Sequence, residues 1–271
     1  MACHEQWPMA KLQVALRRLE ANRPHKFAVI LSTGAMNPVH LAHIQMLHKG
    51  RERLEEAGYT VVGAWISPSH DGYVQPKAKT MQTIGLSDKF RLEVARRASL
   101  EDPLVSVGSW EAEKEGHWPD FPVVCKALAK DLRTSVESEM KCLHEVEVFY
   151  VCGADHAVMC DILRGLDPCR GIGVVVVPRP GQDLPELTED SDEDLVFIAK
   201  PVDGDLTNLS SSKIRDALER LDLKFVKSAM GEVACRFLLD PNQHEFEHYA
   251  ADFDLLRFGS TAEEREAALR G

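Results

Sequence analysis

The 271-residue sequence has no paired cysteine motif and no long apolar run. Its seven cysteines are scattered and form no CxxC pair, which argues against a zinc knuckle and against a disulfide framework. Unpaired cysteines in apolar segments are typical of buried thiols in a reducing compartment, so we expect a cytoplasmic or nuclear protein. No apolar run approaches the roughly 20 residues that span a bilayer, and the N-terminus lacks a secretory signal pattern. We therefore expect no membrane association.

Positive charge is also in short supply, because 32 lysines and arginines face 43 acidic residues and give a net charge of −11. A general nucleic-acid-binding protein needs a basic face, so we expect no nucleic-acid partner. A local positive pocket for a small anion stays compatible with this charge. Much of the acidic excess lies in residues 184–195, which are typical of a solvated surface loop.

Two phosphate-binding fingerprints are missing as well. The Walker pattern GxxxxGK[ST] is absent, and so is the GxGxxG pattern of dinucleotide-binding redox domains. A redox Rossmann enzyme is therefore the least favoured class.

What the chain does contain is a regular alternation of apolar strands and amphipathic helices. Strands are predicted at 26–32, 59–67, 104–110, 145–153, 171–179 and 193–200. Helices are predicted at 10–22, 41–57, 87–99, after the proline-rich segment 117–122, at 155–166 and at 210–221, with a long loop over 68–87. The strands are continuously apolar, as expected when helices cover both faces. The pattern predicts an α/β fold, a doubly wound parallel sheet with C-terminal helices. We expect one domain over 1–271, with its core at about 26–240 and a helical extension at 241–271.

The segment "STGAMNPVHLAH" (32–43) lies where the first predicted strand meets the next helix. A helix N-terminus offers free N–H groups and a positive dipole end, and Gly34 allows an anion close to the backbone. His40 and His43 then lie within about one turn of the helix start and can donate hydrogen bonds to phosphoryl oxygens. The alternative is a tight turn that happens to contain histidines. A metal pair is less favoured, because no carboxylate or cysteine stands at ligand spacing.

A second anion-suited helix start is "LSSSKIRDAL" (209–218). Its serines can cap the helix and donate hydroxyls, and Lys213 and Arg215 add positive charge. The simpler interpretation is a capped surface helix. Two such starts in one sheet favour a phosphate ligand.

These two segments resemble the GxFxPxHxxH and SxTxxR signatures of nucleotidyltransferases. Further segments at 65–79, 105–111, 150–158 and 174–181 resemble, in the same order, the eukaryotic-type nicotinamide/nicotinate mononucleotide adenylyltransferases. The similarity covers roughly residues 26–240. Met36 stands where the signature usually has phenylalanine, Ala42 replaces a common glycine, and Ser212 replaces threonine while keeping the hydroxyl.

The resemblance implies a Rossmann-like nucleotidyltransferase fold and adenylyl transfer from ATP, with Mg²⁺, to a pyridine mononucleotide. The products are NAD or its deamido form and pyrophosphate, made by direct in-line displacement. No metal site built from protein ligands is implied. Family members often form homo-oligomers.

Residue roles follow from the matched positions. The resemblance makes His40, His43 and Arg215 the catalytic residues. It assigns ATP to Ser32, Gly34, Ala35, His40, His43, Gly153, Asp155, Arg179, Ser211, Ser212 and Arg215. It assigns the mononucleotide to Ser67, Tyr73, Lys77, Lys79, Trp110 and Asp155, with the choice between the two lysines open. Trp110 would stack on the pyridine ring, and its alternative is a core tryptophan at a strand end.

Two other functions remain open at this point. One is a related transferase with another phosphate acceptor, such as phosphopantetheine. The other is a non-catalytic nucleotide-binding or chaperone-like protein on the same fold.

Overall fold

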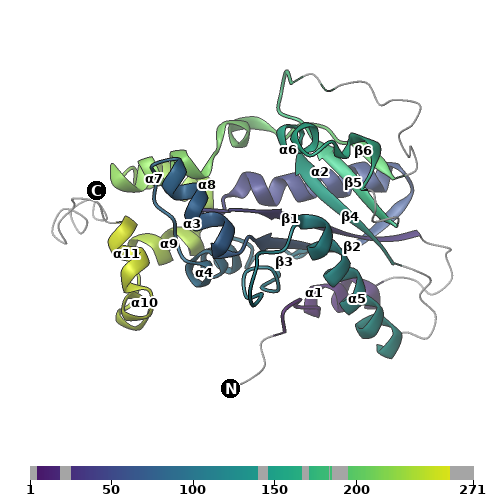
Figure 1. Ribbon diagram of the computed structural model, residues 1–271, viewed down its shortest axis with the longest axis horizontal. Helices are drawn as coiled ribbons and strands as arrows, with labels where there is room; N and C mark the ends of the chain where they lie inside the picture. Colours follow the sequence, from purple (N-terminus) through teal and green to yellow (C-terminus); the bar gives the residue numbers. More distant parts are fainter. Residues whose placement is uncertain are drawn as a thin grey trace.

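The computed structural model describes residues 5–18, 26–139, 146–166, 171–182, 184 and 195–256. Within these residues, six strands form one parallel sheet in the order β3-β2-β1-β4-β5-β6. The strands are β1 (Lys26–Gly34), β2 (Tyr59–Pro68), β3 (Val105–Val107), β4 (Val146–Gly153), β5 (Ile172–Val177) and β6 (Val196–Ile198). The predicted doubly wound α/β fold is confirmed (Figure 1).

Helices connect most of the successive strands and follow the last one. They are α1 (Ala10–Arg17), α2 (Leu41–Glu56), α3 (Asp71–Thr80), α4 (Asp88–Ala98), α5 (Phe121–Glu139), α6 (Ala154–Met159), α7 (Ser211–Glu219), α8 (Leu223–Met230), α9 (Glu232–Leu239), α10 (Gln243–His248) and α11 (Ala250–Leu256). Two short 3₁₀ helices lie at Ile162–Arg164 and Gly204–Asn208.

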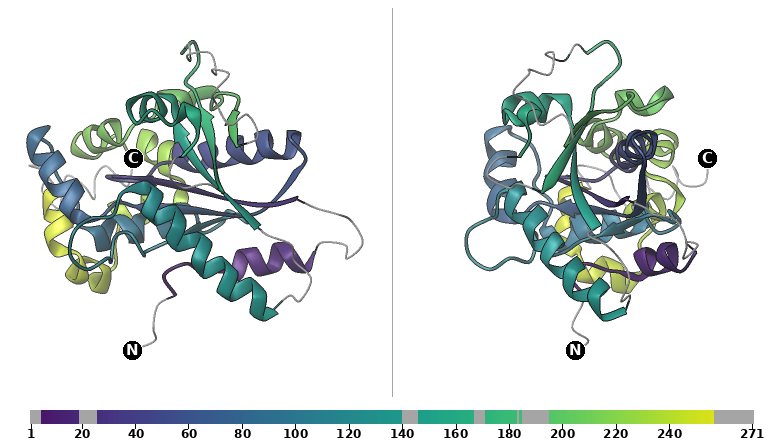
Figure 2. Two further views of the ribbon diagram at one scale, coloured as in Figure 1. Left: turned by 45° about the vertical axis from the view of Figure 1, so that its right-hand side comes forward. Right: turned by 90° about the vertical axis from the view of Figure 1, so that its right-hand side faces the viewer.

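Both faces of the sheet are buried, as the continuous apolar strands predicted. Along β1, Ala28 and Ile30 belong to one apolar cluster and Val29 and Leu31 to the other, and all four are fully buried. Helices α2, α4, α7, α8 and α9 contribute to the first cluster, and α1, α5 and α6 to the second. Figure 2 shows α1 and α5 together on one side of the sheet, with α2 across from them. This period-2 division of one strand between two cores is what a three-layer α/β fold requires.

One expectation is wrong: the predicted loop over 68–87 contains helix α3. Gly72 and Pro76 weaken the helical signal in the sequence. Tertiary contacts compensate, because Val74 and Ala78 lie one turn apart and are both buried. The fully buried Arg91 also holds Asp71, the first residue of α3, through a 2.7 Å ion pair.

Several boundaries also differ from the expected ones. The helix predicted over 155–166 ends at Met159, because Asp161 adopts a left-handed conformation with φ of 52° before the 3₁₀ turn. The third strand covers only Val105–Val107. Most of the acidic segment 184–195 and the C-terminal residues 257–271 lie outside the described residues, as do three of the cysteines. Cys125, Cys152, Cys160 and Cys235 are free thiols.

The strand order reverses between β1 and β4, which are neighbours in the sheet although far apart in sequence. Ligands of doubly wound folds bind in the crevice beyond the strand ends at such a reversal. Gly34 ends β1 and Gly153 ends β4, so both lie at this crevice. None of the helices in the described ranges is long and apolar enough to cross a bilayer.

Candidate active site

The turn from β1 to α2 brings two histidines together at the start of a helix. His40 is the residue before the first turn of α2, and its backbone N–H donates to Nδ1 of His43 at 3.1 Å. The two imidazole rings lie with centroids 3.9 Å apart. Within the described residues, Nδ1 of the buried His40 has no hydrogen-bond partner. A buried polar atom without a partner is costly, so this atom is suited to a ligand.

Both histidines are held neutral. Burial, together with smaller effects of His43 and the positive charge of Arg179, lowers the pKa of His40 to about 2. Burial also lowers the pKa of His43 to about 4, against a hydrogen bond from the His40 backbone that raises it. Each ring therefore offers one N–H donor and one acceptor at neutral pH.

The start of α7 packs against the same turn and joins the two signature segments. Ser211 Oγ donates to the Pro38 carbonyl at 2.7 Å, and Arg215 Nη1 donates to the Asn37 carbonyl at 2.6 Å. Arg215 Nη2 also donates to Ser212 Oγ at 3.1 Å. Ser210 caps the helix by accepting from the Lys213 N–H. The capping expected from the sequence is thus present, and the structure also brings the two signature segments into contact.

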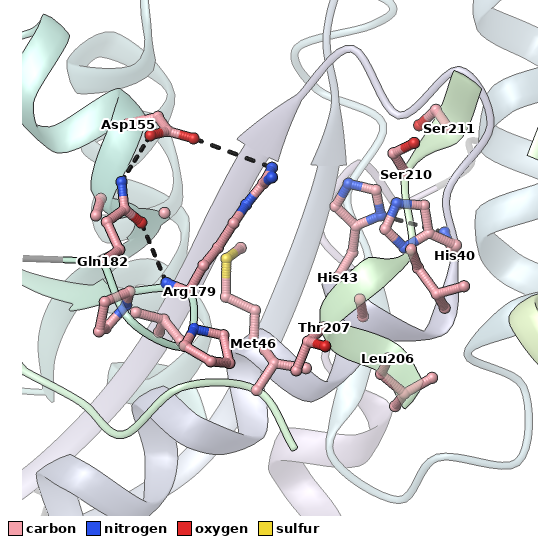
Figure 3. Close-up of a pocket in the computed structure, with 18 residues that line it drawn as sticks. His40, His43, Met46, Asp155, Arg179, Gln182, Leu206, Thr207, Ser210 and Ser211 are labelled. Carbon is pink, nitrogen blue, oxygen red and sulfur yellow. Dashed lines mark hydrogen bonds and ion pairs between the residues drawn. The ribbon is translucent and has the colours of Figure 1, made fainter. Parts of the chain in front are cut away.

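A first cavity, of about 330 Å³, lies between the histidine turn and the end of β5. Figure 3 shows His40, His43, Ser210 and Ser211 on one side and Asp155, Arg179 and Gln182 on the other. Gln182 donates to Asp155 Oδ1 at 2.7 Å, and its Oε1 accepts from the Arg179 N–H. The Arg179 guanidinium lies 4.0 Å from Asp155 and is largely exposed. This wall presents both signs of charge to a ligand.

A second cavity, of about 840 Å³, lies on the other side of Asp155. It is lined by the end of β1, by α3, by the loop before α5 and by α6, including Thr33, Gly34, Ala35, Ser69, Tyr73, Lys77, Glu111, Trp118, Asp120, Phe121, Asp155 and His156. A smaller cavity of about 140 Å³ lies beside Ser211, Ser212 and Arg215, and shares Ala35 and Lys77 with the second one. Among the predicted phosphate-binding residues, His40, His43 and Ser211 line the first cavity, and Ser212 and Arg215 line the small one.

Four of the predicted residues either do not line these cavities or use their side chains in contacts within the protein. Ser32 is buried inside β1 and Lys79 is exposed on α3, and neither lines the cavities above. Ser67 is buried and donates its hydroxyl proton to Glu111. Trp110 packs against the apolar cluster of α1 and α5, with the Lys114 ammonium 5.2 Å from its ring centre. Its position matches the alternative of a core tryptophan.

Several lining residues were missed by sequence reasoning, among them Trp118, Glu111 and His156. Trp118 stands in the proline-rich segment interpreted only as a connection, and its ring centre lies 5.4 Å from that of Tyr73. The signal for Trp118 is present in the sequence as a second tryptophan eight residues after Trp110.

No group of three or more histidine, cysteine or carboxylate side chains that could hold a metal ion occurs among the residues with described positions. Mg²⁺ seldom needs such a group, since it keeps several waters and binds substrate phosphates directly. Asp155 lines both large cavities, and its carboxylate can accept a hydrogen bond from a water bound to such an ion.

Replacing His43 with glutamine is expected to make the stability of the protein less sensitive to acid. Between pH 6.5 and 4 the unfolded chain takes up a proton at this histidine and the folded chain does not, so stability falls as pH falls. At about pH 5 the wild type should have lost about 2 kcal/mol more, relative to neutral pH, than His43→Gln. Urea unfolding at both pH values measures this, with the exposed His244→Gln as the control. Equal pH dependence of wild type and His43→Gln would show that His43 is not held neutral.

A parallel sheet with two anion-suited helix starts near its strand-order reversal is typical of a nucleotide-binding protein. The chain belongs to the cytidylyltransferase-like family, whose model matches residues 31–217.

Named relatives narrow the comparison. A nicotinamide/nicotinic acid mononucleotide adenylyltransferase of Arabidopsis thaliana is 29% identical over 213 residues, which is 73% of this chain and 83% of the relative. The enzyme of the same name from Oryza sativa subsp. japonica is 25% identical over 217 residues, 73% of this chain and 80% of the relative. The structure of the Plasmodium falciparum nicotinic acid mononucleotide adenylyltransferase complexed with APC superposes with a TM-score of 0.51 at 12% identity. It covers 81% of this chain and 98% of its own, and shows that the fold is shared.

Proposed function

We propose that this protein is an adenylyltransferase that joins ATP to nicotinamide or nicotinate mononucleotide and releases pyrophosphate. The observation that carries the proposal is the pair of cavities that meet at Asp155, with the two phosphate-suited helix starts beside their junction. One cavity has the histidine pair, which can donate hydrogen bonds to phosphates, and the other has a tryptophan, on which a pyridine ring can stack. The names of the Arabidopsis and Oryza relatives support the same reaction.

The reaction is an exchange at the α-phosphorus of ATP. A 5′-phosphate oxygen of the mononucleotide attacks that phosphorus, the new P–O–P bond forms, and the bond to the β-phosphate oxygen breaks. Pyrophosphate leaves with the electron pair. Such transfers need little covalent chemistry from the protein, so positioning and neutralisation of charge supply most of the rate.

Neutral His40 and His43 donate N–H groups to the phosphoryl oxygens where charge develops. Ser211, Ser212 and Arg215 hold the leaving phosphates at the N-terminus of α7, whose dipole favours anions. Gly34 and Ala35 leave the β1–α2 turn open to the α-phosphate. Asp155 would accept a hydrogen bond from a water of the Mg²⁺ that accompanies ATP, and that ion would neutralise phosphate charge.

On the acceptor side, Lys77 lines both the second cavity and the smaller one, whereas Lys79 does not. Lys77 is therefore the lysine for the mononucleotide phosphate. Trp118 offers its indole face to the pyridine ring, because an electron-rich ring stacks well on an electron-poor one. Asp155, which lines both cavities, accepts hydrogen bonds from ribose hydroxyls, and Arg179 contacts the adenylate part of ATP.

Pyrophosphate release tests the proposal. The purified protein is mixed with Mg²⁺ and either ATP or CTP, and then with nicotinamide mononucleotide, nicotinate mononucleotide, phosphopantetheine or no acceptor. We expect release only with ATP and a pyridine mononucleotide. Release with phosphopantetheine alone would assign a different acceptor. Binding of ATP without release under any condition would assign a non-catalytic nucleotide-binding protein.

A further inference from the structure

Glu111 is a buried carboxyl group that the phosphate chemistry leaves without a role. It lies in the turn after β3, is 4% exposed, and lines the second cavity together with Trp118. Buried carboxylates are rare unless they are paired or serve a ligand. Glu111 has no ion pair within hydrogen-bond distance among the described contacts, and its partners are hydroxyl groups.

The surroundings of Glu111 are mostly uncharged. Ser67 Oγ donates to Glu111 Oε2 at 2.9 Å, and Ser69 at the end of β2 forms a second hydrogen bond. Burial raises the pKa of Glu111 to about 7, against the two serines and the positive charge of Arg91, while Asp120 raises it slightly. The carboxyl group thus exists in both protonation states near neutral pH.

We propose that Glu111 determines which pyridine mononucleotide the enzyme accepts, because its carboxylate form rejects the anionic nicotinate while accepting the neutral nicotinamide. This inference rests on the proposed function. The two substrates share the ribose and the phosphate and differ in one group, a carboxylate or a carboxamide. A carboxylate wall repels the first and can accept the N–H of the second. Nicotinate is taken only when Glu111 carries its proton.

Other titratable groups on this cavity come from α3, α6 and the loop before α5. They are Tyr73, Lys77, Asp120, Asp155, His156 and Cys160, with Arg91 of α4 and Tyr150 of β4 behind the wall. Burial lowers the pKa of His156 and raises those of Cys160 and Tyr150, so these three stay uncharged near neutral pH and above it. Among the shifted groups of the described cavity wall, Glu111 is the one that titrates near pH 7.

The experiment measures kcat/KM for nicotinate and for nicotinamide mononucleotide, with saturating ATP and Mg²⁺ at fixed ionic strength, between about pH 6 and pH 8.5. The ratio of the two cancels effects on ATP and on the shared phosphate. In the wild type we expect this nicotinate-to-nicotinamide ratio to fall about tenfold or more as pH rises. In Glu111→Gln the ratio should be nearly independent of pH, and at pH 8.5 it should exceed that of the wild type. The exposed Glu115→Gln removes the same charge four residues away and should behave as wild type.

A wild-type ratio that is flat with pH would overturn the inference, and this needs no variant to fold. A pH-dependent ratio that Glu111→Gln retains would overturn it as well, because another group would then be responsible. Glu111→Gln is checked by its melting temperature and by binding of each mononucleotide without ATP, which should show the same change in preference. Failure of both mononucleotides to give pyrophosphate would instead overturn the proposed function, and this inference with it.

Discussion

His43→Ala lowers kcat for pyrophosphate release by about 10²-fold or more, on the role proposed for this residue. His43 lies in the first turn of α2 beside the cavity, and its neutral ring has an N–H available for a phosphoryl oxygen. Removing one positioned donor from a site of developing charge typically costs a factor of about 10² to 10³. The effect should fall on kcat more than on KM, because the contact strengthens in the transition state. Steady-state kinetics with saturating mononucleotide and varied ATP measures both.

The matched control is His244→Ala, an exposed histidine on α10 away from the cavities, which should keep the wild-type rate. A melting curve establishes that His43→Ala is folded. A folded His43→Ala protein whose kcat stays within twofold of the wild type would remove His43 from the mechanism.

Trp118→Ala is expected to raise the KM for the mononucleotide by roughly 10- to 100-fold, with little change in the KM for ATP. Stacking of a heterocycle on an aromatic side chain contributes roughly 1–3 kcal/mol. Trp118 lines the large cavity, whereas the ATP-side cavity is lined by other residues. Initial rates with each substrate varied at a saturating level of the other separate the two constants.

Trp110→Ala is the matched control and should act on a different property. Its ring packs on the apolar cluster of α1 and α5, so truncation should lower the free energy of unfolding by about 3 kcal/mol. Its KM for the mononucleotide should remain near that of the wild type. If Trp110→Ala, and not Trp118→Ala, weakens the mononucleotide selectively, the sequence-based assignment holds and the one from the cavity is wrong.

The pH-dependent properties of this protein come from two kinds of buried group with opposite shifts. Burial lowers the pKa of His43 and raises that of Glu111, because in each case it disfavours the charged form. As pH falls, the shifted pKa of His43 therefore lowers the free energy of unfolding, whereas the shifted pKa of Glu111 raises it. Comparison of each variant with the wild type separates the two, and the pH dependence of the wild type alone does not.

The sequence by itself determined the layer architecture and the two phosphate-suited helix starts. Continuous apolar strands such as 26–32 and 171–179 require cover on both faces, and that requirement is local to each strand. Gly34, the histidines at 40 and 43 and the serines before Arg215 are also local signals, because a helix start is defined by a few consecutive residues. Their meeting at one edge of the sheet follows from the parallel order of the strands.

Only the tertiary structure decided which side chains surround the acceptor cavity. Helix α3 forms despite Gly72 and Pro76, because Arg91 anchors its first residue and its apolar side chains are buried by distant elements. The sequence analysis singled out Trp110 and passed over Trp118, yet the structure packs Trp110 against a core and places Trp118 on the cavity. Glu111 looked like any charged residue after a strand, and its titration near pH 7 arises from burial beside Ser67 and Ser69. Burial depends on contacts between residues far apart in the chain, and no local pattern records it.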